Sequence, residues 1–314
     1  FSENDILLHA LPIFHTHGLF VAINITLLSG SSIIFLTEFN LDTVINNIPN
    51  ATVMMGVPTF YTRLLSDPRF GRNITIGMRL FISGSAPLLA ETHIQFEERT
   101  GHRILERYGM TETNMNTSNP YEGERRAGTV GFPLPGIELR IKDSKTGNIL
   151  PDGEIGEIEV KGENVFLGYW KMPVKTSEEF RKDGFFITGD LGKIDLDGYL
   201  HISGRSKDMI ISGGFNIYPK EIELILDLQK GVLESAVIGI PHIDLGEAVV
   251  GILVYKKKLK PDLTRIYENL IKSLARFKNP KKLFVVDKLP RNTMGKVQKN
   301  VLRDRYKNVF KKID

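Results

Sequence analysis

The chain has 314 residues, of which 41% are hydrophobic and 25% are charged, and its formal net charge is +4. This length and composition predict an ordinary globular protein of two or three domains. The sequence contains no cysteine, which excludes disulfides, thiolate metal sites and a cysteine nucleophile. No apolar run is long enough to cross a membrane, so we expect no membrane span.

Lysines are concentrated toward the end of the chain, and three interpretations of this basic region compete. It can be a solvated face, a nucleic-acid surface, or a source of attraction for an anionic small molecule such as ATP or CoA. Aromatic residues are not interleaved as stacking platforms would require, so we expect no nucleic-acid partner. Residues 1–5 show no signal-peptide core, and the expected compartment is the cytoplasm, or the mitochondrial matrix if a targeting segment lies upstream.

Residues 1–119 alternate short apolar runs with helical stretches. Strands are expected at 32–36, 52–56 and 79–83, and helices at 59–65 and 88–101. This alternation predicts a largely parallel sheet with covered faces.

The rest of the chain has a different texture. Residues 120–206 are richer in glycine, and runs such as 155–160 alternate apolar and polar residues between turn signals, which predicts antiparallel strands and a small barrel. Residues 207–314 mix helices and strands again, and we expect a small α+β domain there. Its predicted linker is the polar segment 204–208.

Two segments place polar residues directly after predicted strands. Residues 106–113 read Glu-Arg-Tyr-Gly-Met-Thr-Glu-Thr, and ligands of open α/β sheets bind at such strand ends. Glu112 can ligate Mg²⁺ and Thr111 can contact a phosphate oxygen, but a simple helix N-cap at Thr111 explains the residues equally well. Asp190 follows a glycine, and it can accept ribose hydroxyls or simply occupy a turn.

Two glycine-containing loops follow. Gly213 and Gly214 can let the backbone approach a ligand closely, or they can belong to an ordinary hairpin turn. Lys296 follows a glycine in the polar loop 289–297, where it can reach an anion or be a simple surface lysine.

In their order and spacing, these segments resemble the adenylate-forming superfamily of acyl-CoA synthetases, luciferases and adenylation domains. The resemblance runs over the whole chain and includes 14–18 (Phe-His-Thr-His-Gly), 56–59 (Gly-Val-Pro-Thr) and 83–88 (Ser-Gly-Ser-Ala-Pro-Leu). It implies an α/β fold: the C-terminal part of a large AMP-binding domain, with a mostly parallel sheet (1–119) and a small antiparallel β-barrel (120–206). A small mobile α+β domain (207–314) would follow.

The resemblance also implies ATP, CoA and Mg²⁺ as ligands, and a role for individual residues. Adenine, acyl phosphate and ribose would be bound by Ser85, Ala86, Pro87, Arg107, Tyr108, Gly109, Met110, Thr111, Asp190 and Arg205. Lys296, Thr111 and Glu112 would be catalytic, with Glu112 as the metal ligand and Lys296 on the carboxylate and α-phosphate. Lys207 would lie at the hinge of the small domain. The acyl and CoA tunnel would be lined by His17, Gly213 and Gly214.

Within the superfamily, segments 57–63, 107–120, 126–135 and 290–299 are most similar to malonyl-CoA synthetases. A dicarboxylate needs a cation for its second carboxylate, ideally a bidentate arginine. Arg63 is the first candidate and Arg126 the second, although a helix-surface role explains Arg63 equally well, and Met115 would narrow the pocket to a short acid. The predicted reaction joins malonate and CoA at the expense of ATP. The alternatives are another short acid, a carrier-protein thiol, or nucleotide binding with impaired catalysis.

One element of the superfamily is not found. Its Ser/Thr/Gly-rich loop, which wraps the β- and γ-phosphates, normally precedes the segment at 14–18. Residues 1–14 do not fit it, and no Gly-x-x-x-x-Gly-Lys-Ser/Thr pattern occurs elsewhere. We therefore expect a fragment of a longer ligase or, as the second choice, a truncated gene product, with an exposed sheet edge and apolar faces.

Overall fold

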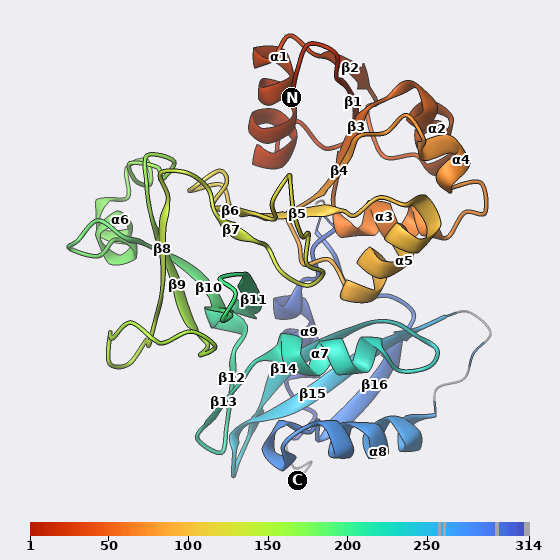
Figure 1. Cartoon of the computed structure of the whole chain (residues 1–314). Helices are drawn as coiled ribbons and strands as arrows, with labels where there is room; N and C mark the ends of the chain where they lie inside the picture. Colours follow the sequence, from red (N-terminus) through yellow and green to blue (C-terminus); the bar gives the residue numbers. More distant parts are fainter. Residues whose placement is uncertain (257–258, 260–261, 293–294, 311–314) are drawn as a thin grey trace. The chain divides into compact units, whose positions relative to one another are not determined.

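The computed structural model describes residues 1–256, 259, 262–292 and 295–310 (Figure 1). The chain divides into two compact units. The first comprises residues 1–188 and 192–202, and the second comprises 189–191 and the residues from 203 onward. The three-part division expected from the sequence stays a prediction, and each unit is described here by itself.

The first unit is built on a seven-stranded sheet with the order β2-β1-β3-β4-β5-β6-β7. Its strands are β1 (Ile6–His9), β2 (Ser32–Phe35), β3 (Val53–Gly56), β4 (Leu80–Ser83), β5 (Leu105–Tyr108), β6 (Thr117–Ser118) and β7 (Phe132–Pro133). The pairs from β2 through β5 are parallel, and β6 and β7 add antiparallel. The predicted parallel sheet is confirmed, and β2 forms one of its edges.

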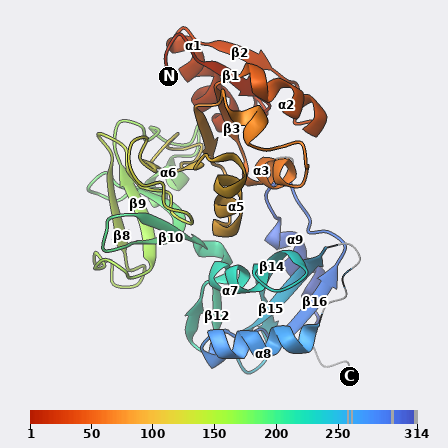
Figure 2. The same cartoon turned by 45° about the vertical axis from the view of Figure 1, so that its right-hand side comes forward.

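Helices of the first unit connect these strands. They are the π-helix η1 (His17–Ile23), α1 (Asn24–Leu28), α2 (Leu41–Asn47), the 3₁₀ turn η2 (Ile48–Asn50), α3 (Pro58–Leu65), α4 (Arg72–Thr75) and α5 (Ala90–Thr100). Proline at the start of α3 fits a first helical turn, and α5 ends at Gly101, whose φ of 80° only glycine adopts easily. The helices α3 and α5 lie side by side (Figure 2). Between them and the sheet, Phe96 packs edge-on against Tyr61 and Phe81.

A second, antiparallel sheet has the order β11-β10-β9-β8. Its strands are β8 (Glu138–Lys142), β9 (Gly156–Lys161), β10 (Phe186–Ile194) and β11 (Leu200–Arg205), and α6 (Pro173–Glu179) lies between β9 and β10 in sequence. Ile158, Val160 and Phe186 are fully buried in its core. The predicted antiparallel strands are confirmed, and β11 and β8 are the edge strands of their sheet.

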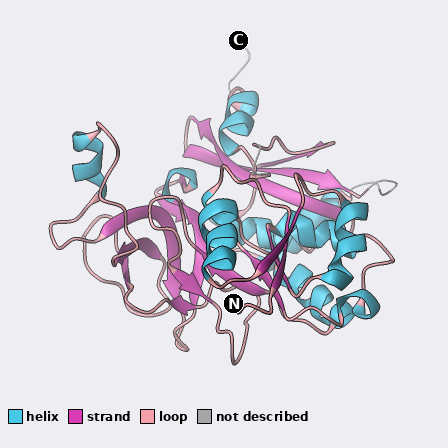
Figure 3. Ribbon diagram, turned by 90° about the horizontal axis from the view of Figure 1, so that it is seen from above, coloured by secondary structure: helices cyan, strands magenta, loops and turns pink. Residues whose placement is uncertain are grey.

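The second unit is a five-stranded sheet with helices on both faces. Figure 3 shows the strands of the whole chain in magenta and its helices in cyan. Its strands are β12 (Ile210–Ser212), β13 (Phe215–Ile217), β14 (Val232–His242), β15 (Gly246–Tyr255) and β16 (Lys282–Val286). Its helices are η3 (Ser206–Asp208), α7 (Pro219–Asp227), α8 (Leu263–Ser273), η4 (Arg276–Lys278) and α9 (Lys299–Tyr306). Residues of α7 and α8 share one apolar core with alternate residues of β14 and β15, and Leu302 of α9 belongs to the core on the other face. The predicted α+β content is confirmed. Among the helices that the structure describes, none is both long and apolar enough to span a membrane.

Candidate active site

The carboxyl ends of the parallel strands bring several predicted site residues together. Ser85 to Pro87 follow β4, and the loop 109–116, here called the Glu112 loop, follows β5. A Cβ added to Gly109 would lie 1.9 Å from the carbonyl oxygen of Asn114, so the loop can close only with glycine there. Ser85 has a φ of 69°, a strained conformation for a non-glycine residue, and such strain is concentrated at functional sites.

His17 borders this edge as the first residue of η1. Its side chain is buried, and its Nδ1 lies 3.1 Å from the hydroxyl of Ser85. Burial lowers the pKa of His17 to about 3, and the positive charges of His15 and Arg107 act in the same direction. His17 is therefore neutral near pH 7, and it can hold Ser85 by a hydrogen bond but cannot supply a positive charge.

Arg107 lies inside β5 and not after the strand, as the sequence predicted, and the Glu112 loop begins two residues later. Burial lowers the pKa of its guanidinium below the ordinary value. Its Nε is buried and has no hydrogen-bond partner among the described residues. Buried donors are normally satisfied, so this nitrogen is suited to a ligand's acceptor.

The Glu112 loop is fastened by a segment that follows β9. The side-chain nitrogen of Asn164 donates hydrogen bonds to the carbonyls of Thr113 and Met115, at 2.7 and 3.1 Å. The backbone N–H of Phe166 donates to the carbonyl of Glu112 at 2.8 Å, and the hydroxyl of Tyr169 donates to Glu112 Oε1 at 3.0 Å. We call these three residues, Asn164, Phe166 and Tyr169, the clasp.

Sequence reasoning did not find the clasp. A local signal exists, since Asn164 stands in a Gly-Glu-Asn turn directly after a strand and Tyr169 follows a glycine. That pattern does not say which loop the two side chains reach.

The predicted ribose residues Asp190 and Arg205 are paired within the second unit. Arg205 Nε lies 2.7 Å from Asp190 Oδ1, and the Asp190 side chain is only 8% exposed. Asp190 lies in the middle of β10, and not after a strand or in a turn as the sequence predicted. The neighbouring strand β11 carries Arg205, so the sheet pairing explains their meeting across fifteen positions. Lys207 is exposed in η3, beside Asp208, which accepts two hydrogen bonds from Arg303.

Gly213 and Gly214 form the tip of the β12–β13 hairpin. Their φ angles are 56° and 83°, which is the two-residue type I′ turn that glycines favour. No heavy atom lies within 4 Å of a Cβ added to Gly214. Space therefore exists beside this tip within the second unit.

Lys296 lies in the Lys296 loop (291–297), of which the structure describes residues 291–292 and 295–297. Its backbone N–H donates to Asn292 Oδ1 at 2.9 Å, and its carbonyl accepts from the Asn292 N–H at 3.0 Å. Partial desolvation lowers the pKa of Lys296, the nearby charge of Arg205 lowers it further, and Asp190 opposes the shift. The charges of Asp190 and Arg205 therefore both act on the Lys296 ammonium.

The three candidate pocket residues occupy different surroundings. Arg63 is exposed on α3, with its guanidinium 5.8 Å from the ring centre of Phe39. Arg126 is bound by protein carboxylates, at 3.2 Å from Asp195 and 2.9 Å from Asp197. Met115 is partly buried against the core of the parallel sheet. Arg126 is therefore committed to protein partners, whereas Arg63 is not paired with an acid among the described residues.

The residues of the edge fit a magnesium ion in one respect. Among the residues that the structure describes, no three histidine, aspartate or glutamate side chains are gathered to hold a metal. Mg²⁺ in nucleotide sites is typically bound by one or two carboxylates together with substrate phosphates. Glu112, with one oxygen held by Tyr169, fits that pattern as a single protein ligand.

Family models match both units of the chain. The model described as "AMP-binding enzyme" matches residues 1–170, and the one described as "AMP-binding enzyme C-terminal domain" matches residues 221–296. The chain belongs to the AMP-binding enzyme family. The predicted superfamily is thereby confirmed.

Relatives of this AMP-binding enzyme include ligases for small acids. It is 38% identical to the malonate–CoA ligase of Arabidopsis thaliana, over 98% of this chain and 55% of that protein. It is also 38% identical to the sulfoacetate–CoA ligase of Cupriavidus necator, over 94% of this chain and 58% of that protein. The solved structure of ATP-bound MatB from Rhodopseudomonas palustris matches with a TM-score of 0.97 and 61% identity, over 99% of this chain and 62% of that one. The chain spans a little more than half the length of these relatives.

Proposed function

We propose that this chain carries the nucleotide- and thiol-handling residues of an ATP-dependent malonate–CoA ligase. The observation that carries the proposal is that the Glu112 loop and the His17–Ser85 pair meet at the carboxyl edge of the parallel sheet, where the hydroxyl of Thr111 lies 3.5 Å from that of Thr16, the neighbour of His17. Ligands of open α/β sheets bind at this edge. The similarity to ligases for malonate and sulfoacetate supports the reaction class.

The first step joins the acid to AMP. A carboxylate oxygen of malonate attacks the α-phosphorus of ATP, the bond to the β-phosphate oxygen breaks, and pyrophosphate leaves. Two anions approach each other in this step, so cationic and donor groups must offset the charge of the transition state. We assign that role to Lys296 and to the hydroxyl of Thr111, and Mg²⁺ held by Glu112 would neutralise phosphate charge.

The nucleotide itself is held by groups from both strand-end loops and from the β10–β11 pair. Asp190 accepts the ribose hydroxyls, and Arg205 keeps its carboxylate in place. Ser85 to Pro87 and residues 107–111 surround adenine and the acyl phosphate. The buried Nε–H of Arg107 donates a hydrogen bond to an acceptor atom of the ligand.

The second step forms the thioester. The CoA sulfur attacks the carbonyl carbon of malonyl-adenylate, the carbon–oxygen bond to phosphate breaks, AMP leaves, and the thiol proton is released. Lys296 and the Gly213–Gly214 tip serve different steps, so the small domain, residues 207–314, turns about Lys207 between them. His17, which is neutral, lines the tunnel without attracting the phosphates of CoA.

The acid is a short dianion in this proposal. Malonate and sulfoacetate each carry a second anionic group one carbon away from the carboxylate, and an arginine is the residue best suited to bind it. Arg63 is preferred over Arg126, because Asp195 and Asp197 already neutralise Arg126. Met115 limits the length of the acid.

The experiment is acid-dependent exchange of pyrophosphate into ATP by the longest natural gene product that contains this chain. Malonate is expected to support exchange, and free CoA to accept the acyl group with release of AMP. Exchange with another acid and none with malonate would refute the substrate, and transfer only to a carrier-protein thiol would refute the CoA step.

The length of the chain relative to its relatives supports a second candidate for the 314 residues taken alone, namely nucleotide binding without turnover. Calorimetry of the chain distinguishes the two candidates. Equal affinity for AMP and ATP, with no exchange activity, would favour the binding module.

A further inference from the structure

The clasp holds both the backbone of the Glu112 loop and the side chain of Glu112. Asn164 and Phe166 bind backbone carbonyls of the Glu112 loop, and so fix the path of the chain. Of these three described residues, Tyr169 is the one that donates a hydrogen bond to the carboxylate, with its hydroxyl 3.0 Å from Oε1. The path of the loop and the orientation of its acid therefore depend on different residues.

Tyr169 is itself held firmly. Its N–H donates to the hydroxyl of Thr176 at 2.9 Å, and its ring packs edge-on against Phe166 at 4.8 Å. Lys175 Nζ lies 4.9 Å from the centre of the same ring. The preceding Gly168 has a φ of 147°, and a Cβ there would lie 2.6 Å from Thr176, so only glycine permits this turn. The hydroxyl of Tyr169 is thus presented to Glu112 before any ligand arrives.

A preoriented donor of this kind matters most when the acid binds a cation. Ligating carboxylates need partners that fix their rotamer, and loss of such a partner typically weakens metal binding or activity about 10- to 100-fold. A carboxylate has two oxygens, so Tyr169 can hold Oε1 and Glu112 would still have Oε2 to offer a metal. A purely structural hydrogen bond would have no such dependence on the metal.

We propose that Tyr169 is a positioning residue that orients Glu112 for a magnesium ion bound with the phosphates of the nucleotide. This inference rests on the proposed function, since it takes Glu112 as the metal ligand. It adds a residue from outside every motif that predicted the site. Tyr169 contacts Glu112 and takes no part in the chemical steps.

The test compares two variants that each lose one tyrosine hydroxyl. Tyr169→Phe removes the bond to Glu112 and keeps the ring. Tyr199→Phe is the matched control, because the Tyr199 hydroxyl also donates a 3.0 Å bond, to the carbonyl of Glu124, in the same unit. Calorimetry of the longest natural gene product would measure the affinity for ATP with excess Mg²⁺ and with EDTA, so that the ratio isolates the contribution of the metal.

We expect Tyr169→Phe to reduce this ratio about 10-fold or more, and Tyr199→Phe to leave it unchanged. The affinity in EDTA should be the same in all three proteins. An unchanged ratio in Tyr169→Phe, or equal losses in the two variants, would overturn the inference. If the wild-type protein itself binds ATP equally well with and without Mg²⁺, both the metal role of Glu112 and the inference are overturned.

A double-mutant cycle separates the two claims. Glu112→Gln alone tests the proposed function, and Tyr169→Phe added to Glu112→Gln tests whether Tyr169 acts through that acid. If it does, Tyr169→Phe has no further effect on the ratio once Glu112 is changed. A loss in Glu112→Gln with an equal, independent loss in Tyr169→Phe would leave the proposed function intact and refute the positioning role.

Discussion

The Glu112 loop and the Lys296 loop present their charged residues in opposite ways. The Glu112 loop follows a buried parallel strand, contains the buried Thr113 and Asn116, and is held by the clasp from a distant part of the chain. Within its described residues, the Lys296 loop is held by the reciprocal bonds of Asn292 and Lys296 and by the bridge between Arg291 and Val297. Arg291 also pairs with Glu234 of β14, which belongs to the same unit. The Lys296 side chain is exposed at its end.

This difference fits the two half-reactions of the proposed ligase. A group that binds phosphate charge throughout should be fixed on a rigid sheet edge, because preorganised groups need no rearrangement during the reaction. A lysine that serves only adenylation has to be brought in and withdrawn, and a loop that is fastened to β14 of its own unit can move together with that unit. Four predictions examine this contrast, from the largest expected effect to the smallest.

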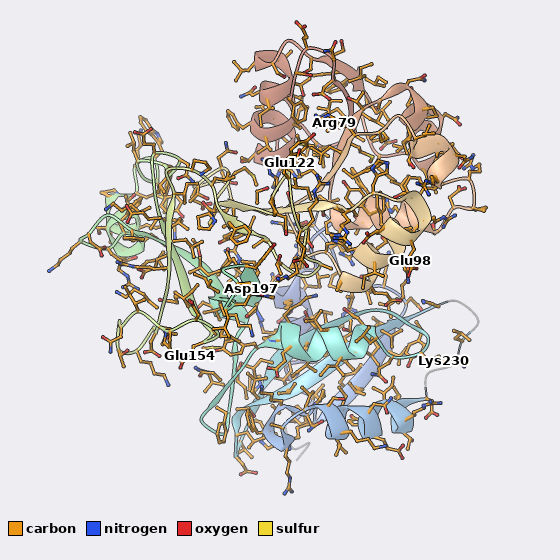
Figure 4. The ribbon with its side chains drawn as sticks, viewed as in Figure 1. Arg79, Glu98, Glu122, Glu154, Asp197 and Lys230 are labelled. Atoms are coloured by element: carbon orange, nitrogen blue, oxygen red, sulfur yellow. The ribbon has the colours of Figure 1, made fainter. Side chains whose placement is uncertain are left out.

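Removal of the Lys296 ammonium should affect one step only. Lys296→Ala is expected to slow malonate-dependent pyrophosphate exchange by about 10²- to 10³-fold, the usual loss of one transition-state donor. Formation of malonyl-CoA from supplied malonyl-adenylate should stay near the wild-type rate. Lys230→Ala, at an exposed position, is the control (Figure 4). Equal losses in both steps would contradict the contrast.

Neutralisation of Glu112 by a side chain of the same size should weaken the metal-dependent step. Glu112→Gln is expected to reduce adenylation about 10- to 100-fold and to raise the Mg²⁺ concentration needed for half-maximal rate. Glu98→Gln, on the exposed face of α5, should behave as wild type. The proposed role fails if Glu112→Gln keeps the wild-type magnesium dependence.

Two asparagine substitutions compare how the loops are held. Asn164→Ala leaves the carbonyls of Thr113 and Met115 without their donor, and should lower the free energy of unfolding by about 1–3 kcal/mol. Asn292 is exposed in the Lys296 loop, so Asn292→Ala should change the free energy of unfolding by about 0.5 kcal/mol. Urea unfolding of the longest natural gene product measures both values. Similar losses at the two positions would show that the loops are held alike.

Because the pKa of Lys296 is lowered, the two chemical steps should depend differently on pH. Lysine offsets negative charge only while protonated, and a pKa below the ordinary 10.5 makes it lose that proton at a lower pH. Adenylation should therefore decline as pH rises, starting below 10.5, while the thioester step does not follow this decline. Lys296→Arg should extend the plateau upward, because the guanidinium stays charged. If the pH profiles of adenylation by the wild-type protein and by Lys296→Arg superimpose, the assignment is refuted.

Much of the geometry of the candidate site could be predicted from the sequence, because its residues lie in or next to elements that local pattern predicts. Strand–helix alternation placed Ser85 and the Glu112 loop at strand ends, and parallel pairing then brought those ends to one edge. Asp190 and Arg205 were assigned together by resemblance, and they meet because neighbouring strands carry them.

The remaining features depend on contacts that no local pattern encodes. Tyr169 meets Glu112 across 57 positions, and Arg126 meets Asp195 and Asp197 across 69 and 71. Nothing near either residue in sequence indicates these partners. The π-helix at His17 also escaped prediction, and it requires Gly18, where a Cβ would lie 2.2 Å from the carbonyl oxygen of Pro12.

The most direct test of the proposed chemistry follows one oxygen atom. The longest natural gene product would be incubated with ATP, CoA and malonate labelled with oxygen-18 in its carboxylates, and the products would be read by mass spectrometry. Attack of the carboxylate on the α-phosphorus, followed by thiol attack on the carbonyl carbon, leaves one labelled oxygen on AMP and none on pyrophosphate. We expect AMP with one oxygen-18 together with malonyl-CoA. Unlabelled AMP, or ADP as the nucleotide product, would contradict an acyl-adenylate.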